Sequence, residues 1–224
     1  MVVRAYQARV TGAMSKFSQS FTTLPGLKYL PGCFAPQAQK EIIAAVLSAT
    51  QEAPFHTPVM PRSGRPFSVR MTNLGPLGWV SDRAGYRYQA AHPETGLPWP
   101  AIPEMLLSLW RDVADYPHPP QACLVNLYRE GAKMGLHRDG DEEDFSAPVV
   151  SVSLGDTAIF RIGGLERGGK TDTLKLASGD VLVMGGPSRL RYHGIDRVLG
   201  GSSTLVPGGG RINLTLRRVN KPRL

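Results

Sequence analysis

Two segments carry apolar side chains at the spacing of an α-helix, three and four residues apart. In the first, which opens at Pro36 and is closed by Pro54, four apolar positions share one face: Ile42, Ile43, Val46 and Leu47. In the second, between Pro103 and Pro117, the corresponding positions are Leu106, Leu109, Trp110 and Val113. Proline suits the first turn of a helix and cannot continue one. The pattern therefore predicts two amphipathic helices that each bury one face.

After Pro120 the apolar positions change to a period of two, which is typical of strands. The first strand alternates an apolar set with a partly polar one: Cys123, Val125 and Leu127 against Leu124, Asn126 and Tyr128. Further strands are expected within 149–162, where Gly155 and Asp156 interrupt a β-branched run, and at 174–176, 181–184 and 211–217. Many short strands behind two helices predict a mainly β sandwich or barrel with helices on one side.

The segment between the two helices, residues 54–102, is rich in proline, glycine, arginine and aromatic residues. It is too long for a bare connection, so we expect it to be functional or to contain short strands. The chain of 224 residues suits one domain. No apolar run approaches the roughly 18 residues of a membrane helix, which predicts a soluble protein.

The N-terminal residues and the cysteines indicate a cytoplasmic location. Residues 1–20 contain Arg4, Arg9 and Lys16 but no continuous apolar stretch, so a basic extension is expected there and not a secretory signal. Cys33 and Cys123 are the only cysteines and lie far apart in the sequence. This usage fits a reducing compartment in which neither thiol is bridged.

The net charge of +8 is concentrated in the N-terminal part of the chain. Residues 1–90 hold ten Lys and Arg against three acidic residues, whereas residues 91–224 hold sixteen against fifteen. Such an excess suits an anionic partner such as nucleic acid. A solvated basic surface without a partner would explain the charge equally well.

A candidate metal site is formed by His137, Asp139 and His193. The first two lie two residues apart, on the same side of an extended chain. Two histidines and one carboxylate on one face of a metal leave positions open, as in non-haem Fe(II) oxygenases. An exposed His-Asp pair without a role is the alternative. The acidic run 139–144 lacks the alternation of a calcium loop, and it forms either a solvated loop or a pocket wall beside the metal.

The segment 211–217 alternates without a break. Ile212, Leu214 and Leu216 can pack on one side, which turns four polar residues to the other: Arg211, Asn213, Thr215 and Arg217. The two arginines lie ~20 Å apart along a strand, and if each guanidinium leaned in by roughly 6 Å they could hold a five-carbon dicarboxylate at both ends. Asn126 and Tyr128 could add hydrogen bonds. The alternative is an edge strand with solvated arginines.

Together these motifs resemble the AlkB-like Fe(II)- and 2-oxoglutarate-dependent dioxygenases, and in particular the bacterial alkylation-repair enzymes. The resemblance runs in order from about residue 29 to 218. In the C-terminal half it rests on segments 126–128, 131–134, 137–142, 147–155, 158–160, 178–181, 185–194 and 211–217. Upstream, segments 71–75, 78–79, 85–88 and 97–100 are similar to that family's nucleotide-recognition lid. Met184 is a departure, because the bacterial relatives carry tryptophan there.

The family implies a double-stranded β-helix (jelly roll) core at about 120–218 within one domain, 29–224, preceded by a basic extension, 1–28. The lid would cover about 54–102. The family also implies Fe(II) at His137, Asp139 and His193. The residues implied for 2-oxoglutarate are Arg211 with Tyr128 at the distal carboxylate, and Arg217, Asn126 and Asn213 around the metal-proximal end. Those implied for substrate are Trp79 stacked on the base, Asp141 at the exocyclic amine, and Tyr86 and Arg167 near phosphate.

The implied activity is oxidative dealkylation of bases such as 1-methyladenine and 3-methylcytosine in DNA, or in RNA. It uses O2 and releases formaldehyde, succinate and CO2. Extrusion of the base fits this chemistry, because the alkyl group is out of reach in a stacked pair. Two alternatives stay open: a 2-oxoglutarate-dependent hydroxylase of tRNA, mRNA or protein, and a non-catalytic nucleic-acid-binding module on the same fold. A monomer is expected.

Overall fold

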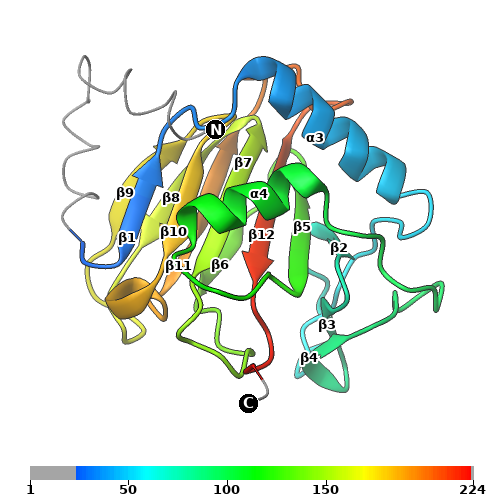
Figure 1. Cartoon of the computed structure of the whole chain (residues 1–224), viewed down its shortest axis with the longest axis horizontal. Helices are drawn as coiled ribbons and strands as arrows, with labels where there is room; N and C mark the ends of the chain where they lie inside the picture. The colour runs from blue at the N-terminus through cyan, green and yellow to red at the C-terminus, as the bar shows by residue number, and fades with distance from the viewer. Residues whose placement is uncertain (1–23, 223–224) are drawn as a thin grey trace.

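Two antiparallel sheets stacked face to face form the body of the protein in the computed structural model, which describes residues 24–222 (Figure 1). The larger sheet has the order β1 (Leu27–Leu30), β10 (Val181–Met184), β7 (Val149–Gly155), β12 (Arg211–Arg217), β5 (Ala122–Tyr128), β2 (Arg70–Leu74). The smaller has the order β6 (Met134–His137), β11 (His193–Leu199), β8 (Thr157–Ile162), β9 (Asp172–Leu176). The predicted mainly β jelly roll is confirmed.

The apolar runs that the sequence interrupts at glycine are strands that change sheet. β7 and β8 are separated by Asp156 alone, yet they belong to different sheets. Gly155 has φ 89°, and a Cβ there would lie 2.5 Å from the carbonyl oxygen of Gly210. Because only glycine adopts this conformation in so little space, the chain can turn sharply from one sheet into the other.

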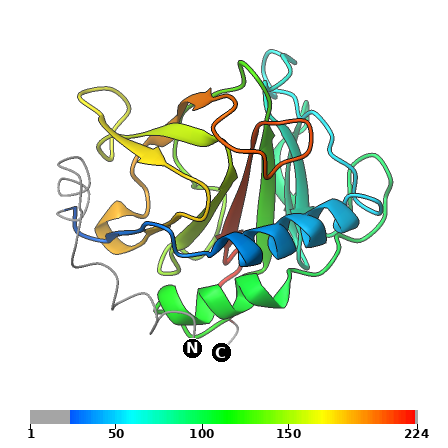
Figure 2. The same ribbon diagram turned by 90° about the horizontal axis from the view of Figure 1, so that it is seen from above.

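Both predicted helices lie on the outer face of the larger sheet, side by side in Figure 2. They are α3 (Pro36–Ala49) and α4 (Glu104–Val113). The core between helices and sheet contains the predicted helical faces and alternate residues of the strands, among them Ile42, Leu106, Trp110, Val125 and Leu214. The outward positions of β5, β7 and β12 are thus covered by helices, which leaves their other positions to face the smaller sheet.

The inner faces of the two sheets enclose a second core with a polar end. Its apolar part comes from both sheets and includes Leu124, Val149, Phe160, Ile162 and Leu182. The inward positions of β12 are polar and nonetheless buried. Since β12 lies between β7 and β5, the alternative of an exposed edge strand is wrong.

The hairpin of β3 (Gly78–Asp82) and β4 (Gly85–Gln89) stands apart as a two-stranded sheet in the predicted lid. β2 falls within the range 54–102 but pairs with β5 in the larger sheet. The first described strand, β1, begins at Leu27, so the last two residues of the predicted N-terminal extension, 1–28, belong to the larger sheet. The rest of that extension lies almost entirely outside the described residues.

Candidate metal centre and active-site cavity

The three predicted metal ligands come together at one end of the two sheets. His137 ends β6 and His193 begins β11, and the two are direct partners in the pairing of these strands. Asp139 follows β6, with Oδ1 3.9 Å from His137 Nε2 and Oδ2 3.9 Å from His193 Nε2. One ligand atom from each residue lies within 4.8 Å of the other two. In the described part of the chain this is the one group of this kind.

Both imidazoles are oriented by the backbone. His137 Nδ1 lies 3.0 Å from the carbonyl oxygen of Gly135, and His193 Nδ1 lies 3.0 Å from that of Arg191. If each Nδ1 carries the proton and donates it to the carbonyl, each Nε2 presents a lone pair to the site. Beside His193, a Cβ on Gly194 would lie 2.5 Å from the carbonyl oxygen of Met134. Glycine at 194 therefore permits the close approach of β11 to β6 that brings the two histidines together.

The surroundings of Asp139 and His193 favour the forms that bind a metal. Burial alone would raise the pKa of Asp139, but Arg217 and the two imidazoles hold it well below its usual range. Burial and the neighbouring His137 lower the pKa of His193 to about 4, so its imidazole is neutral at pH 7. Asp139 Oδ2 is buried and accepts no hydrogen bond from the described residues. A divalent cation fits this donor set, because two imidazole nitrogens and an unpartnered carboxylate oxygen converge on one point.

The hydrogen-bond network around Asp139 includes residues that were not predicted from the sequence, Arg189, Glu142 and Tyr88. Arg189 donates to the backbone carbonyl of Asp139 at 2.8 Å and to Glu142 Oε2 at 3.0 Å. Tyr88 donates to Glu142 Oε1 and accepts from Arg217 at 3.2 Å. The available signal was the acidic run: a second carboxylate so close to Asp139, that of Glu142, is costly to bury unless a cation lies beside it.

The acidic run is a wall of the site and not a solvated loop. Glu142 and Asp144 are buried together with Asp139, whereas Asp141 and Glu143 are exposed. Asp141 and Glu142 line the cavity beside the candidate metal ligands. Of the two interpretations left open for the run, the pocket wall is the one that agrees with the structure.

Arg211 and Arg217 differ in their partners although both are buried. Arg217 pairs with Asp139 Oδ1 at 2.8 Å and lies 3.6 Å from Glu142 Oε1. Arg217 already has acidic partners in the protein, so the two arginines are not both free to bind the two carboxylates of one ligand. Arg211 is 0% exposed and donates to Ser153 Oγ at 3.0 Å, while its Nε and Nη1 have no hydrogen-bond partner within residues 24–222.

The surroundings of Arg211 suit an anionic ligand. Its guanidinium carbon lies 5.2 Å from the centre of the Tyr128 ring, and burial lowers its pKa. No acidic side chain in the described part of the chain forms an ion pair with it. A buried cation with two unused donors is costly unless an anion binds there. A carboxylate fits this position, because a guanidinium presents paired donors to it.

Asn126 and Asn213, the two other residues expected to bind 2-oxoglutarate, lie on the inner face of the larger sheet, as Arg211 does. Asn213 donates to Ser151 Oγ at 2.7 Å and to the Val152 carbonyl at 2.9 Å. Asn126 is its direct partner on β5, and the Oδ1 atom of Asn126 is buried without a hydrogen-bond partner in the described structure. Asn126 can therefore serve a ligand in the cavity, whereas Asn213 is already engaged with β7.

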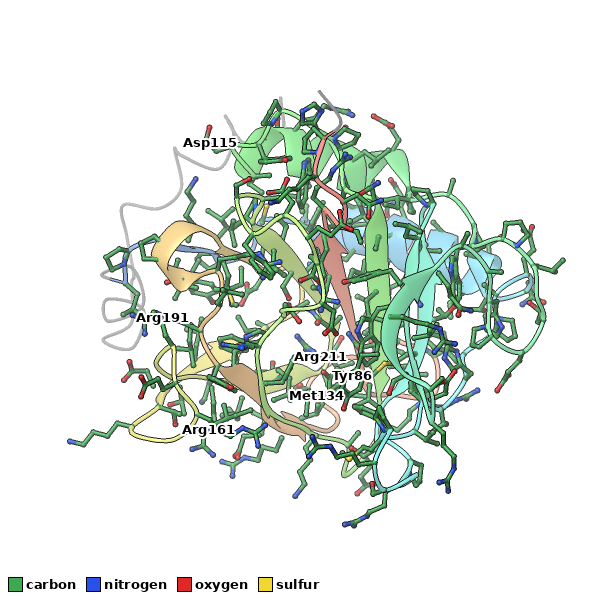
Figure 3. The ribbon with its side chains drawn as sticks, turned by 90° about the horizontal axis from the view of Figure 1, so that it is seen from below. Tyr86, Asp115, Met134, Arg161, Arg191 and Arg211 are labelled. Atoms are coloured by element: carbon green, nitrogen blue, oxygen red, sulfur yellow. The ribbon has the colours of Figure 1, made fainter. Side chains whose placement is uncertain are left out.

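One cavity of about 810 Å³ is lined by all twelve residues proposed from the sequence. Figure 3 shows three of its lining residues, Tyr86, Met134 and Arg211, close together in the middle of the view, with Arg161 and Arg191 toward the margin. Met184, the position that departs from the bacterial pattern, also lines the cavity. The volume falls in the range of small-molecule and cofactor sites.

The lid contributes aromatic residues to this cavity. Trp79 on β3 stacks on Tyr86 of β4 with ring centres 5.5 Å apart and an interplanar angle of 19°. The indole Nε1 of Trp79 donates to Asp141 Oδ2 at 2.8 Å. Tyr86 is 51% exposed, and Arg167 lies over the ring of Tyr192 at 5.8 Å. Aromatic rings, a carboxylate and a cation thus line this part of the cavity together.

Several residues outside the cavity have structural surroundings. His56 and His92 are buried, and their rings pack in a T-shaped, edge-to-face arrangement with centres 5.1 Å apart. Cys33 and Cys123 are free thiols. Among the described residues, no helix is both long and apolar enough to span a membrane.

Comparisons with known proteins point to one family of enzymes. Residues 26–217 match the model of the 2OG-Fe(II) oxygenase superfamily. An alpha-ketoglutarate-dependent dioxygenase AlkB homolog of Caulobacter vibrioides is 54% identical over 218 residues, which cover 97% of each chain. The AlkB enzyme of Escherichia coli is 45% identical over 192 residues, covering 84% of this chain and 88% of its own. The solved structure of OsALKBH1 has a TM-score of 0.76 and 32% identity, covering 87% of this chain and 97% of that one.

Proposed function

Because this chain belongs to the 2OG-Fe(II) oxygenase superfamily, we propose that it removes alkyl groups oxidatively from nucleic-acid bases. It is an AlkB-like dioxygenase that uses Fe(II), 2-oxoglutarate and O2. The proposed substrates are bases such as 1-methyladenine and 3-methylcytosine in DNA, with RNA as the second candidate. We expect it to act as a monomer in the cytoplasm, with residues 54–102 as the lid of a single domain, 29–224.

In this proposal His137, Asp139 and His193 hold the iron. Arg211 binds the distal carboxylate of 2-oxoglutarate, because it is buried and forms no ion pair with any acidic side chain of residues 24–222. The ring of Tyr128 supports its guanidinium, and Asn126 offers an unused amide oxygen to the same cavity. Arg217 keeps the Asp139 carboxylate ionised and oriented. Asn213 is proposed to lie near the metal-proximal end of 2-oxoglutarate, where its hydrogen bonds to β7 hold it in place.

The reaction supplied by iron, 2-oxoglutarate and O2 is hydroxylation of the alkyl group, with succinate, CO2 and formaldehyde as products. The role of the protein is to position the groups and to exclude water. The target base must leave its stack to reach the buried cavity. We propose that Trp79 provides an aromatic platform for that base and that Asp141 accepts a hydrogen bond from its exocyclic amine. Tyr86 and Arg167 are proposed to lie near the phosphates.

The observation that carries the proposal is the meeting of three features in one cavity: the His-Asp-His cluster, the unpaired Arg211 and the stacked aromatic pair. The first two suit any 2-oxoglutarate-dependent oxygenase. The third favours a planar substrate, since a base stacked on an aromatic ring is stabilised by about 1–3 kcal/mol.

The test is incubation of purified protein with Fe(II), 2-oxoglutarate and short oligonucleotides that each carry one methylated base. DNA and RNA versions of one sequence are compared, single- and double-stranded, and mass spectrometry follows loss of the methyl group. Demethylation of 1-methyladenine or 3-methylcytosine with matching formaldehyde release is the expected result. Turnover of 2-oxoglutarate stimulated by a protein or by unmodified tRNA, with no loss of methyl groups from any oligonucleotide, would contradict the proposal and favour a hydroxylase.

A further inference from the structure

Tyr88, a tyrosine of the lid, forms hydrogen bonds with the polar cluster that holds the candidate iron ligand Asp139. Tyr88 lies on β4 and is not among the residues that line the cavity. Its hydroxyl donates to Glu142 Oε1 and accepts from Arg217 Nη1 at 3.2 Å. Arg217 in turn donates to Asp139 Oδ1 at 2.8 Å. Two hydrogen bonds therefore join a lid residue to the carboxylate of the metal centre.

The same cluster holds Asp139 from its other side. Arg189 binds Glu142 Oε2 at 3.0 Å and the carbonyl oxygen of Asp139 at 2.8 Å. Two arginines and two carboxylates thus form a group without net charge, and all four are at least nine-tenths buried. Such a network is costly to disturb in part, because each lost contact leaves a buried charge without its partner. Its geometry is consequently sensitive to the position of Tyr88.

Tyr88 is also coupled to the proposed base platform. In the β3–β4 hairpin, Trp79 and Tyr88 are direct cross-strand partners. Trp79 faces the cavity, where its indole donates to Asp141, while Tyr88 contacts Glu142, the next residue along the chain. The hairpin is therefore attached to adjacent residues of one loop, one beside the proposed base site and the other in the cluster around Asp139.

We propose that Tyr88 is a positioning residue that couples the seating of the base on Trp79 to the orientation of the Asp139 carboxylate, through Glu142 and Arg217. The inference rests on the proposed function, because it requires a base as occupant of the lid. It assigns no contact with substrate or metal to Tyr88. When the hairpin is docked, the tyrosine hydroxyl completes the hydrogen bonding of Arg217. When the hairpin is displaced, Arg217 and Glu142 lose a shared partner.

The test uses Tyr88→Phe, which removes the hydroxyl and leaves the ring. Tyr116→Phe is the matched control, since the Tyr116 hydroxyl also donates to a buried carboxylate, that of Asp144, and Tyr116 does not line the cavity. Each protein is loaded with Co(II) and 2-oxoglutarate, and its d–d absorption is recorded with and without a 1-methyladenine oligonucleotide. With Fe(II), kcat for demethylation and KM for 2-oxoglutarate are measured, and thermal unfolding is followed separately.

The expected result is that the oligonucleotide changes the Co(II) spectrum of the wild-type protein and of Tyr116→Phe but not that of Tyr88→Phe. Demethylation kcat of Tyr88→Phe should fall roughly tenfold, as for other residues that orient a metal ligand. Its KM for 2-oxoglutarate should stay near the wild-type value because Arg211 is untouched. The inference is wrong if Tyr88→Phe gives the wild-type spectral change, or if its kcat falls only in proportion to a loss of folded protein. If the wild-type protein demethylates none of the methylated oligonucleotides, the proposed function is refuted, and this inference with it.

Discussion

Replacing Arg211 should stabilise the protein in the absence of ligand while removing its response to 2-oxoglutarate. The guanidinium is 0% exposed and two of its nitrogens have no hydrogen-bond partner among the described residues. In Arg211→Met the side chain keeps much of its apolar length and loses the charge. Relief of the buried charge outweighs the loss of the Ser153 hydrogen bond and of the contact with the Tyr128 ring, each about 1 kcal/mol. We expect a net gain of about 1–3 kcal/mol in the free energy of unfolding.

Arg217→Met is the matched control, on the same strand and similarly buried. Arg217 pairs with Asp139 and Glu142, so its removal leaves two buried carboxylates short of positive charge. Breaking a buried ion pair from one side costs about 3–5 kcal/mol. In a chain of this size each kcal/mol shifts the melting temperature by roughly 2–4 °C, so the two variants should move in opposite directions by several degrees.

The assay is thermal and urea unfolding of the metal-free proteins, repeated with Mn(II) and with Mn(II) plus 2-oxoglutarate. At a hundredfold excess over its dissociation constant, a ligand stabilises the folded wild-type protein by about 2.7 kcal/mol. Arg211→Met should lose this additional stabilisation and keep the part due to Mn(II). If Arg211→Met lowers the stability of the metal-free protein as Arg217→Met does, or keeps the full response to 2-oxoglutarate, the assignment of Arg211 as an unpaired anion-binding group is refuted.

Three further predictions concern the metal, the lid and pH. Asp139→Ala should abolish both turnover and tight Mn(II) binding, measured by calorimetry, because only two imidazoles remain; retained binding would contradict the ligand assignment. Trp79→Ala should weaken binding and repair of a methylated oligonucleotide by about 1–3 kcal/mol while substrate-independent 2-oxoglutarate turnover and the melting temperature stay near wild type; a parallel drop in melting temperature would instead identify Trp79 as a structural residue. Burial and the nearby His92 lower the pKa of His56 to about 4, so the neutral imidazole is favoured by folding. Its contribution to stability is present above the unfolded pKa of about 6.5 and is lost as pH falls from there toward 4. Between pH 7 and pH 5, urea unfolding should show a loss roughly 2 kcal/mol larger in the wild type than in His56→Phe, and equal losses would show that His56 titrates normally.

Much of the architecture follows from local patterns that the sequence already displays. The period of two in residues 122–128 and 211–217 predicted which side chains share a face. As expected, the apolar set packs in the core under the helices, and the partly polar set lies on the inner face of the larger sheet. The helical faces opened by Pro36 and preceded by Pro103 were equally predictable. These predictions succeed because the periodicity of side chains in a helix or strand is a property of the backbone itself.

The partners of buried charges, by contrast, were decided by the tertiary structure. Arg211 and Arg217 occupy equivalent positions in one alternating strand, and nothing local distinguishes them. One lies beside Ser153 with two unused nitrogens, and the other meets Asp139 and Glu142. Alternation determines which face of a strand a side chain occupies, but the opposing charge comes from a loop distant in sequence.

The sequence by itself thus determined the two helices, several of the core strands, the inward set on the last strand, the three candidate metal ligands and the family, whereas the strands β6 and β11 that carry the two histidines were not predicted. The convergence of those ligands, the burial of Glu142 and Arg189, and the insertion of Tyr88 into their cluster were decided only by the folded chain. His137 and His193 are far apart in the sequence and meet because Gly194 lets β11 approach β6 closely. Whether a charged residue is solvated or buried depends on which distant segments surround it, and local pattern carries no information about those segments.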